Sequence, residues 1–273
     1  MKHPVSLVIA AKNCEDRIEG TIRPWAGLVE EIIVVDEESG DLTAERARNL
    51  GAKVIRQKAP DGNFDRNRKT GMEASTQPWI LYLDTDERPN AELLLEFESF
   101  FKDPQKLNEV SGVRIPNDFY FLGTKLRYGI YRKSAGEIRL FKRDAYQYPC
   151  EQGLHRGVLV KERVVDFENS YRHFNVNTLS EWFMKTNQYT EIDALAASGP
   201  AADPFNTVWR AIRFFIKHYF FRQGFRDGTA GFLAVVYFSF YHFTQNFKIW
   251  EKQQLKSKVL EQDYLNPISI PKR

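Results

Sequence analysis

Residues Trp79 to Glu87 read WILYLDTDE, and this stretch decides the fold. Five apolar residues follow one another without interruption, and the polar residues Asp84 to Glu87 come directly after them. A short continuous run of this kind is typical of a strand that is buried on both faces. The acidic turn is therefore predicted to stand at the carboxyl end of a strand inside a sheet.

The first hundred residues contain further apolar strand-like runs, which alternate with helical patterns. The predicted strands are 5–11, 31–36, 53–56 and 79–84, and the predicted helices are 15–23, 42–50, 65–74 and 89–101. An alternating order of strands and helices is typical of a mostly parallel sheet with helices on both faces. The fold class is therefore predicted to be α/β.

The pattern changes after residue 110. Strands predicted at 113–115 and 137–143, with a hairpin over 158–165, form an antiparallel extension of the sheet. From residue 177 the pattern is helical, with helices predicted at 179–197, 205–221 and 228–255. We expect an α/β domain over residues 1–176, with halves of about 1–100 and 101–176, and an α-helical C-terminal extension over 177–273.

The composition excludes several classes of protein. An apolar share of 42% in 273 residues supports a real core, and a net charge of +3 argues against a nucleic-acid partner. Two distant cysteines, Cys14 and Cys150, form no disulfide framework and suit a reducing compartment. We expect no signal peptide, and the longest nearly uncharged stretch, 228–243, is shorter than the roughly 20 residues of a spanning helix.

Two acidic positions are expected to meet at one edge of the sheet. Asp36 ends the second predicted strand and Asp84 ends the fourth, and ligands of open α/β sheets bind at the carboxyl ends of the strands. Asp84 and Asp86 form a DXD motif, and two carboxylates this close repel each other unless a cation lies beside them. Mg²⁺ or Mn²⁺ binds one or two carboxylates and completes its shell with phosphate oxygens and water. We predict a divalent metal site here, and the alternative is a solvated surface turn.

Three other positions each have a functional and a structural interpretation. The loop from Asp36 to Asp41 caps the next helix through Ser39 or Asp41, offers Asp36 as an acceptor to a nucleobase or ribose, or does both. Arg66 is either a solvated helix position or neutralises a pyrophosphate. His173 is either packed among aromatic residues or is the third metal ligand, beside Asp84 and Asp86.

The loop after the first strand argues against a dinucleotide-binding enzyme. Lys12 and Asn13 stand where a glycine-rich fingerprint would begin, and the first glycine of the chain is Gly20. A P-loop is also missing from the sequence. A hydride-transfer enzyme and a P-loop nucleotidase are therefore both disfavoured.

The order of the motifs resembles that of a known family. It runs through VIAAKN at 8–13, IIVVD at 32–36, SGDLT at 39–43, GAKV at 51–54, RN at 66–67 and WILYLDTDE at 79–87. This order is similar to that of the family 2 inverting glycosyltransferases of GT-A fold, particularly the lipopolysaccharide core glucosyltransferase type. A weaker likeness continues through FLG at 121–123, RLF at 139–141, Lys185 with Tyr189, GFRDG at 224–228 and KIWE at 248–251.

The resemblance implies a nucleotide sugar as donor, which we expect to be UDP-linked, and a glycolipid or oligosaccharide acceptor of the lipopolysaccharide core type. It places Asp36 at the nucleoside, and Asp84 and Asp86 near the nucleotide and the metal. The residues expected to contact the nucleotide sugar are Ala11, Lys12, Asn13, Asp36, Ser39, Arg66, Asn67, Asp84 and Thr85. The reaction would be an inverting displacement, in which the metal stabilises the departing diphosphate.

The chain departs from this branch at the expected general base. The branch carries a His-Glu pair after the antiparallel strands, whereas here Arg156 follows His155. Glu151 and His155 are therefore the two candidates for the base that takes the proton from the attacking hydroxyl. A structural role for His155 is the alternative.

The helical extension mixes bulky aromatic residues with cations, above all over residues 209–222. Such a helix suits the membrane interface, and the alternative is a core helix whose basic side chains extend outward to solvent. We expect a cytoplasmic protein that makes peripheral contact with the inner face of the cytoplasmic membrane. A polyprenyl-phosphate glycosyltransferase and a catalytically inactive sugar-nucleotide-binding scaffold are the rival functions.

Overall fold

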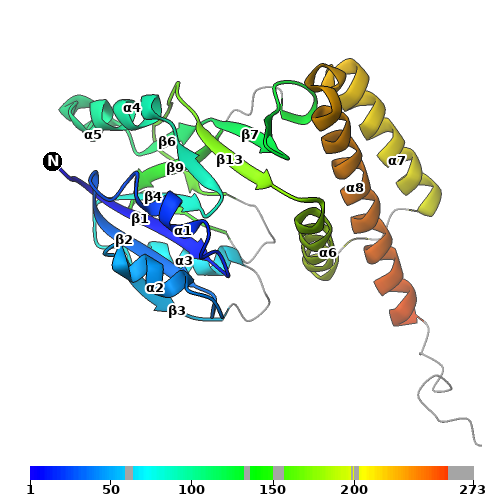
Figure 1. Cartoon of the computed structure of the whole chain (residues 1–273), viewed down its shortest axis with the longest axis horizontal. Coiled ribbons are helices and arrows are strands. Elements are labelled where there is room, and N and C mark those ends of the chain that lie inside the picture. The colour runs from blue at the N-terminus through cyan, green and yellow to red at the C-terminus, as the bar shows by residue number, and fades with distance from the viewer. Residues whose placement is uncertain (59–63, 132–135, 150–156, 198, 200–202, 258–273) are drawn as a thin grey trace, which may run out of the picture. The chain divides into compact units, whose positions relative to one another are not determined.

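The computed structural model describes residues 1–58, 64–131, 136–149, 157–197, 199 and 203–257 (Figure 1). The chain divides into two compact units. The first contains residues 1–127 and 131–177, and the second contains residues 128–130 and 178–273. The second unit therefore includes a short piece of chain from within the sequence of the first.

A seven-stranded sheet forms the centre of the first unit. Its order is β12-β6-β9-β4-β1-β2-β3, and the strands are β1 (His3–Ala11), β2 (Val29–Asp36), β3 (Lys53–Arg56), β4 (Trp79–Asp84), β6 (Gly112–Ile115), β9 (Glu137–Lys142) and β12 (Val164–Asp166). The four N-terminal strands are parallel to one another, and β9 is antiparallel to both β4 and β6. This mostly parallel sheet with its antiparallel strand confirms the predicted α/β fold class.

Helices cover both faces of this sheet because β1 is apolar at successive positions. Leu7 and Ile9 pack in the cluster that contains residues of α1 (Ile18–Ile22), α2 (Thr43–Asn49) and α4 (Ala91–Phe101). Val8 lies in the other cluster, with Met72 of α3 (Phe64–Glu73) and Tyr82 of β4. All three β1 side chains are fully buried, as expected for a central strand.

A second sheet has the order β5-β13-β7-β8. Its strands are β5 (Glu87–Pro89), β7 (Asn117–Phe121), β8 (Thr124–Lys125) and β13 (Tyr171–Val176). β13 is antiparallel to β5 and parallel to β7. The first unit also contains α5 (Pro104–Glu109) and a short ladder of β10 (Tyr146–Gln147) with β11 (Leu159–Val160).

The hairpin predicted over 158–165 is wrong. β11 pairs with β10, whereas β12 pairs in parallel with β6 at the edge of the large sheet. Gly112 of β6 explains part of this arrangement, because a Cβ there would lie 3.2 Å from a methyl group of Val160 and 3.3 Å from one of Val164. The missing side chain leaves room for both valines to pack against β6.

The second unit is helical. It contains α6 (Leu179–Ala196), α7 (Pro204–Ile216), a π-helical turn η3 (Lys217–Phe221), a 3-10 turn η4 (Gly224–Asp227) and α8 (Gly228–Ser257). Asp193 of α6 accepts hydrogen bonds from Tyr241 Oη (2.7 Å) and Gln245 Nε2 (2.8 Å) of α8. Among the helices that the structure describes, none combines the length and hydropathy needed to cross a membrane.

Residues 128–130, which include the first two residues of η1 (Gly129–Tyr131), belong to this helical unit although they lie between β8 and β9 in sequence. The N–H of Gly129 donates to the carbonyl of Arg222 (2.9 Å), and the N–H of Tyr128 donates to Asp227 Oδ2 (2.9 Å). The Arg226 guanidinium lies 4.3 Å from the centre of the Tyr128 ring. Gly129 has a φ of +64°, and a Cβ there would lie 3.1 Å from the Cα of Gly224, so this position requires glycine.

Substitution of Gly71 tests how closely α3 packs on the sheet. A Cβ at this position would lie 2.5 Å from Val8 Cγ1 and 3.2 Å from Val35 Cγ2. We expect Gly71→Ala to lower the free energy of unfolding by about 1–3 kcal/mol, since overpacking outweighs the gain in helix propensity. Urea denaturation measures this change.

Gly27→Ala is the matched control, because a Cβ at Gly27 would meet nothing within 4 Å. Its effect on the free energy of unfolding should stay within about 0.5 kcal/mol. Equal stability of the two variants would contradict the close packing of α3 on β1 and β2.

Candidate active site

The strand register brings the predicted acidic residues to one edge of the large sheet. Ala11, the last residue of β1, pairs with Asp36 of β2, and Ala10 pairs with Asp84 of β4. Asp36 and Asp84 therefore flank the end of β1 on its two sides. Asp36 is fully buried and Asp84 is partly exposed.

The Asp36 carboxylate is held by a cation and by the backbone of its own loop. Arg56 Nε lies 3.1 Å from Asp36 Oδ2, and the N–H of Ser39 lies 3.3 Å from each carboxylate oxygen. The Ser39 hydroxyl accepts the N–H of Asn13 (2.9 Å), and Asn13 Oδ1 accepts the N–H of Gly40 (3.0 Å). Ser39 thus joins the loops that follow β1 and β2.

The capping interpretation of this loop holds in part. The N-cap position of α2 is Leu42, and Ser39 does not cap the helix. Asp41 Oδ1 accepts the N–H of Thr43 (3.0 Å) at the first residue of the helix. The loop therefore starts α2 through Asp41 while Ser39 bonds to the β1 loop.

Lys12 and Asn67 meet at Glu37. Lys12 Nζ lies 2.7 Å from Glu37 Oε1, and Asn67 Nδ2 donates to Glu37 Oε2 (3.0 Å). Asn67 is buried and also accepts a hydrogen bond from Gln57 Nε2 (2.8 Å). Asn67 therefore connects α3 to the β2 loop, and its neighbour Arg66 is half-buried on the same helix.

Arg68 is a residue of this site that the sequence reasoning missed. Its Nε donates to Asp84 Oδ1 (3.0 Å), its Nη2 contacts the same oxygen, and its Nη1 pairs with Asp65. Asp65 is fully buried and also accepts the Tyr148 hydroxyl (2.8 Å). The available signal was the spacing of three residues between Asp65 and Arg68, which places both on one face of a helix.

The pKa of Asp84 reflects these neighbours. Burial alone would raise the pKa of this carboxyl, but the guanidinium groups of Arg68 and Arg139 outweigh burial and hold the pKa below its usual value. Asp84 is therefore ionised at neutral pH.

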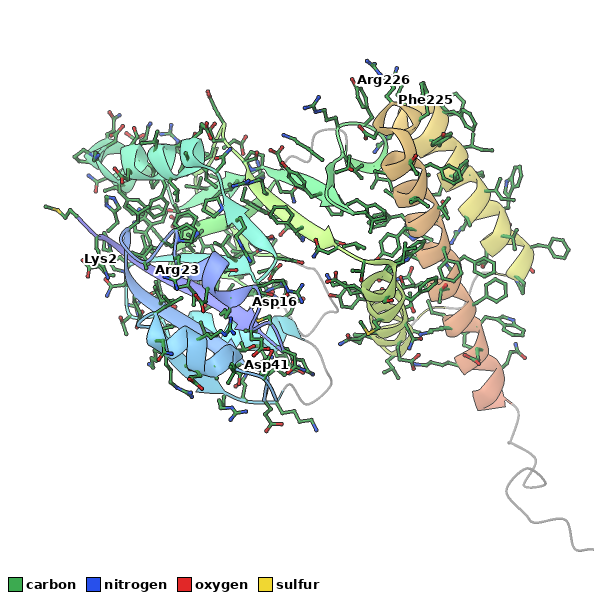
Figure 2. The ribbon with its side chains drawn as sticks, viewed as in Figure 1. Lys2, Asp16, Arg23, Asp41, Phe225 and Arg226 are labelled. Carbon is green, nitrogen blue, oxygen red and sulfur yellow. The ribbon has the colours of Figure 1, made fainter. Side chains whose placement is uncertain are left out.

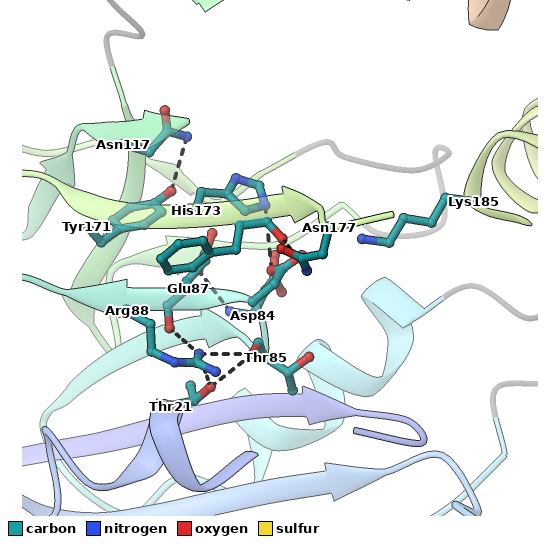
Figure 3. Close-up of polar contacts among 12 residues, drawn as sticks. Thr21, Asp84, Thr85, Glu87, Arg88, Asn117, Tyr171, His173, Asn177 and Lys185 are labelled. Atoms are coloured by element: carbon teal, nitrogen blue, oxygen red, sulfur yellow. Dashed lines mark hydrogen bonds and ion pairs between the residues drawn. The ribbon is translucent and has the colours of Figure 1, made fainter. Parts of the chain in front are cut away.

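Glu87 and Arg88 fix the backbone of the turn. Glu87, fully buried, accepts the N–H of Asp84 at Oε2 (2.9 Å). Arg88 Nη1 donates to the carbonyl of Thr85 (2.9 Å) (Figure 3). Arg88 Nη2 donates to the carbonyl of Arg17 (2.7 Å). The turn is thus tied to the segment that enters α1, and Thr85 is held through its carbonyl.

His173 reaches the acidic turn from the second sheet. Its register partner across β13 and β5 is Glu87, and its Nε2 lies 3.5 Å from Asp86 Oδ1. The N–H of Phe174 donates to the carbonyl of Asp86 (2.9 Å). Burial would lower the pKa of His173, but the nearby carboxylates, Asp86 first, raise it above its usual value.

The side chains at this turn include carboxylate oxygens and an imidazole nitrogen, which are ligand types that divalent metals take. Within the part of the chain that the structure describes, no group of three histidine, cysteine, aspartate or glutamate side chains is arranged around one point. Asp86 and His173 face each other, and Mg²⁺ or Mn²⁺ needs few protein ligands when phosphate oxygens and water complete its shell. Asp84, bonded to Arg68, stays a predicted ligand.

Two predicted residues lie outside the described residues. Glu151 and His155, the candidates for the general base, fall within residues 150–156, so their roles stay predictions. Arg156 lies in the same segment.

Comparisons with known proteins find similarity to glycosyltransferases. The family model described as glycosyl transferase family 2 matches residues 6–161. The lipopolysaccharide core biosynthesis glycosyltransferase LpsC of Rhizobium meliloti is 25% identical, over 97% of this chain and 98% of its own length. An uncharacterized glycosyltransferase of Rickettsia felis is 28% identical, over 93% of this chain and 92% of its own length. The crystal structure of S. aureus TarS 1-349 in complex with UDP-GlcNAc has a TM-score of 0.44 and 14% identity, covering 96% of this chain and 93% of that one.

Substitution of Arg68 tests its ion pairs with Asp65 and Asp84. We expect Arg68→Met to lower the free energy of unfolding by about 3 kcal/mol or more, because it leaves the buried Asp65 and the Asp84 carboxylate without their shared cation. Chemical denaturation at pH 7 measures this change.

The control is Arg23→Met, which removes an ion pair from the surface, where the Arg23 side chain is 63% exposed. Its cost should not exceed about 0.5 kcal/mol. A loss at Arg68 as small as the loss at Arg23 would show that the Asp65–Arg68–Asp84 chain is not an important buried network.

Proposed function

The chain belongs to glycosyl transferase family 2, and from that premise we propose that it transfers a hexose from a nucleotide sugar to a hydroxyl of a glycolipid or lipopolysaccharide-core-type acceptor. One observation carries this proposal: Asp36, Asp84 and the Asp86–His173 pair gather at the carboxyl edge of a mostly parallel sheet. The likeness to LpsC along the full chain supports the acceptor class.

The nucleoside is proposed to bind at the end of β2. Asp36 stands at the end of β2 beside Arg56, and its carboxylate is the proposed acceptor for a nucleobase N–H or a ribose hydroxyl. The bonded loops that follow β1 and β2 bring Ala11, Lys12, Asn13 and Ser39 to the same place. We propose that these residues and Arg66, Asn67, Asp84 and Thr85 bind a UDP-linked donor.

The metal is proposed to lie at the turn after β4. Asp86 and His173, with Asp84, would hold Mg²⁺ or Mn²⁺, which when bound supplies positive charge for the departing diphosphate. Arg88 and Glu87 keep the turn in place by their bonds to its backbone. A general base must then remove the proton from the attacking hydroxyl, and we propose Glu151 or His155 for that role.

The second unit supports a location at a membrane surface. Phe205 and Trp209 of α7 are 87% and 55% exposed, and they line an apolar hollow with Pro204, Asn206, Val208 and Ile212. Residues 204–226 contain five basic residues and no acidic residue. Exposed aromatic side chains, such as Phe225 beside Arg226 in Figure 2, together with an excess of cations suit an anionic lipid surface. We propose peripheral contact with the inner face of the cytoplasmic membrane, where a lipid-linked acceptor would lie.

A donor screen tests the proposed reaction. UDP-, GDP- and dTDP-sugars with Mn²⁺ are incubated with the protein, and release of nucleoside diphosphate is measured. We expect one donor class to be turned over, and we expect Asp86→Ala to lower kcat/KM by about 100-fold or more, since a metal contributes several kcal/mol to stabilising the leaving group.

Asp166→Ala is the matched control, because the Asp166 side chain is 67% exposed and forms a surface ion pair with Arg114. It should leave kcat/KM nearly unchanged. Binding of a donor without turnover would favour the inactive scaffold, and product formed on a polyprenyl phosphate would favour that rival. If no donor is bound or turned over, the proposed function is wrong.

Vesicle sedimentation tests the membrane proposal. The full-length protein should sediment with vesicles of phosphatidylcholine and phosphatidylglycerol, and less with phosphatidylcholine alone. Phe205→Ser with Trp209→Ser should weaken binding at least about tenfold, because burial of each large apolar side chain contributes about 1.5–3 kcal/mol.

Leu95→Ser is the control, since Leu95 of α4 is a 67% exposed apolar residue in the other unit. It should bind vesicles like the unaltered protein. Equal partitioning of the double variant and the unaltered protein would remove α7 as the membrane contact.

A further inference from the structure

Arg139 of β9 is a buried cation that joins the two larger sheets of the first unit. The residue is 4% exposed. Its guanidinium carbon lies 4.4 Å from the ring centre of Tyr82 on β4 and 5.4 Å from that of Tyr171 on β13. β4 belongs to the seven-stranded sheet and β13 to the four-stranded sheet, so one side chain contacts both.

The contacts of Arg139 are concentrated on one nitrogen. Nη2 lies 2.7 Å from Glu87 Oε1, 3.2 Å from Glu137 Oε2 and 3.9 Å from Asp84 Oδ2. Nε and Nη1 are buried, and within the described residues neither has a hydrogen-bond partner. The side chain therefore contributes a positive charge, one strong bond and a flat surface, although burying such a group is costly.

The strong bond leads directly to the turn after β4. Glu87 binds Arg139 through Oε1 and accepts the N–H of Asp84 through Oε2. The same glutamate is the register partner of His173, whose imidazole faces Asp86. Displacement of the Glu87 carboxylate would therefore alter Asp84 through its backbone and the pairing of β5 with β13.

We propose that Arg139 is a positioning residue for the metal and nucleotide turn: it holds the Glu87 carboxylate in the orientation that fixes Asp84 and, through the strand pairing, Asp86 opposite His173. This inference rests on the proposed function of that turn. Arg139 is proposed to act through Glu87 rather than by direct contact with the metal or the donor. It orients a residue that in turn holds the metal ligands, and removal of such a partner typically weakens metal binding by about 10- to 100-fold.

The two tyrosine rings explain why the cation is an arginine. A planar guanidinium stacks on aromatic faces and keeps one edge for a carboxylate, whereas an ammonium group is a compact, strongly hydrated point charge. Lysine at position 139 would retain the charge but would not fill the space between Tyr82 and Tyr171. We therefore expect Arg139→Lys to keep the positioning of Glu87 only in part, although better than Arg139→Met.

Calorimetric titration of the full-length protein with UDP, in Mn²⁺ and separately in EDTA, tests the proposal. The quantity of interest is the gain in UDP affinity that Mn²⁺ provides. We expect Arg139→Met to reduce this gain about tenfold and Arg139→Lys about threefold, while the affinity in EDTA changes less. A purely structural role would lower both affinities together.

Two further variants keep the test decisive. Arg139→Met leaves the buried Glu87 charge without its cation, so the melting temperature should fall. Adding Glu87→Gln should recover much of the melting temperature but not the Mn²⁺-dependent gain. Arg114→Met, which removes an exposed pair with Asp166 on the neighbouring strand β6, should change neither quantity.

The contradicting outcomes are distinct. A Mn²⁺-dependent gain in Arg139→Met or Arg139→Lys equal to that of the unaltered protein would overturn the role of Arg139 alone. Recovery of the gain in the double variant would also overturn it, because charge compensation would then be its whole function. An unaltered protein that binds none of UDP, GDP and dTDP would overturn the proposed function as well.

Discussion

Buried carboxylates can gather at the end of β4 only because two guanidinium groups lie among them. Asp65, Asp84 and Glu87 are carboxylates in or beside a low-dielectric interior, and Arg68 and Arg139 separate them. In this series of contacting side chains the charges alternate in sign, so each anion has a cation as its neighbour. The position of the turn after β4, and with it the candidate metal site, depends on this balance.

The same turn is also held by its backbone at successive residues. The N–H of Asp84 donates to Glu87, the carbonyl of Thr85 accepts from Arg88, and the carbonyl of Asp86 accepts from Phe174. The partners are Glu87 of the turn, the adjacent residue Arg88, and Phe174 of the second sheet. A site that has to bind a charged ligand in a defined geometry benefits from such preorganisation, because less order must be created when the ligand binds.

The local sequence pattern was sufficient to predict the parallel strands of the sheet and the edge at which ligands bind. The apolar runs identified β1 to β4, and the rule for parallel sheets placed Asp36 and Asp84 together. His173 was identified as a candidate, but its approach to Asp86 depends on the pairing of β13 with β5, which no local pattern reveals. Arg68 and Arg139 were missed as site residues because an arginine is solvated by default, and only tertiary structure brings tyrosine rings and carboxylates around it. The hairpin at 158–165 failed for a similar reason, since the free edge of β6 competed for the second strand.

The short segment 128–130 can form its contacts only late in the synthesis of the chain. Its Tyr128 bonds to Asp227, 99 residues later in the sequence, and its Gly129 bonds to Arg222. A ribosome adds about 5–20 residues per second, so this segment waits roughly 5–20 seconds for its partners to be synthesised. Residues 128 and 129 therefore reach their final contacts only when the C-terminal helices have emerged. Until then Tyr128 and Gly129 of the nascent chain lack these two hydrogen-bond partners.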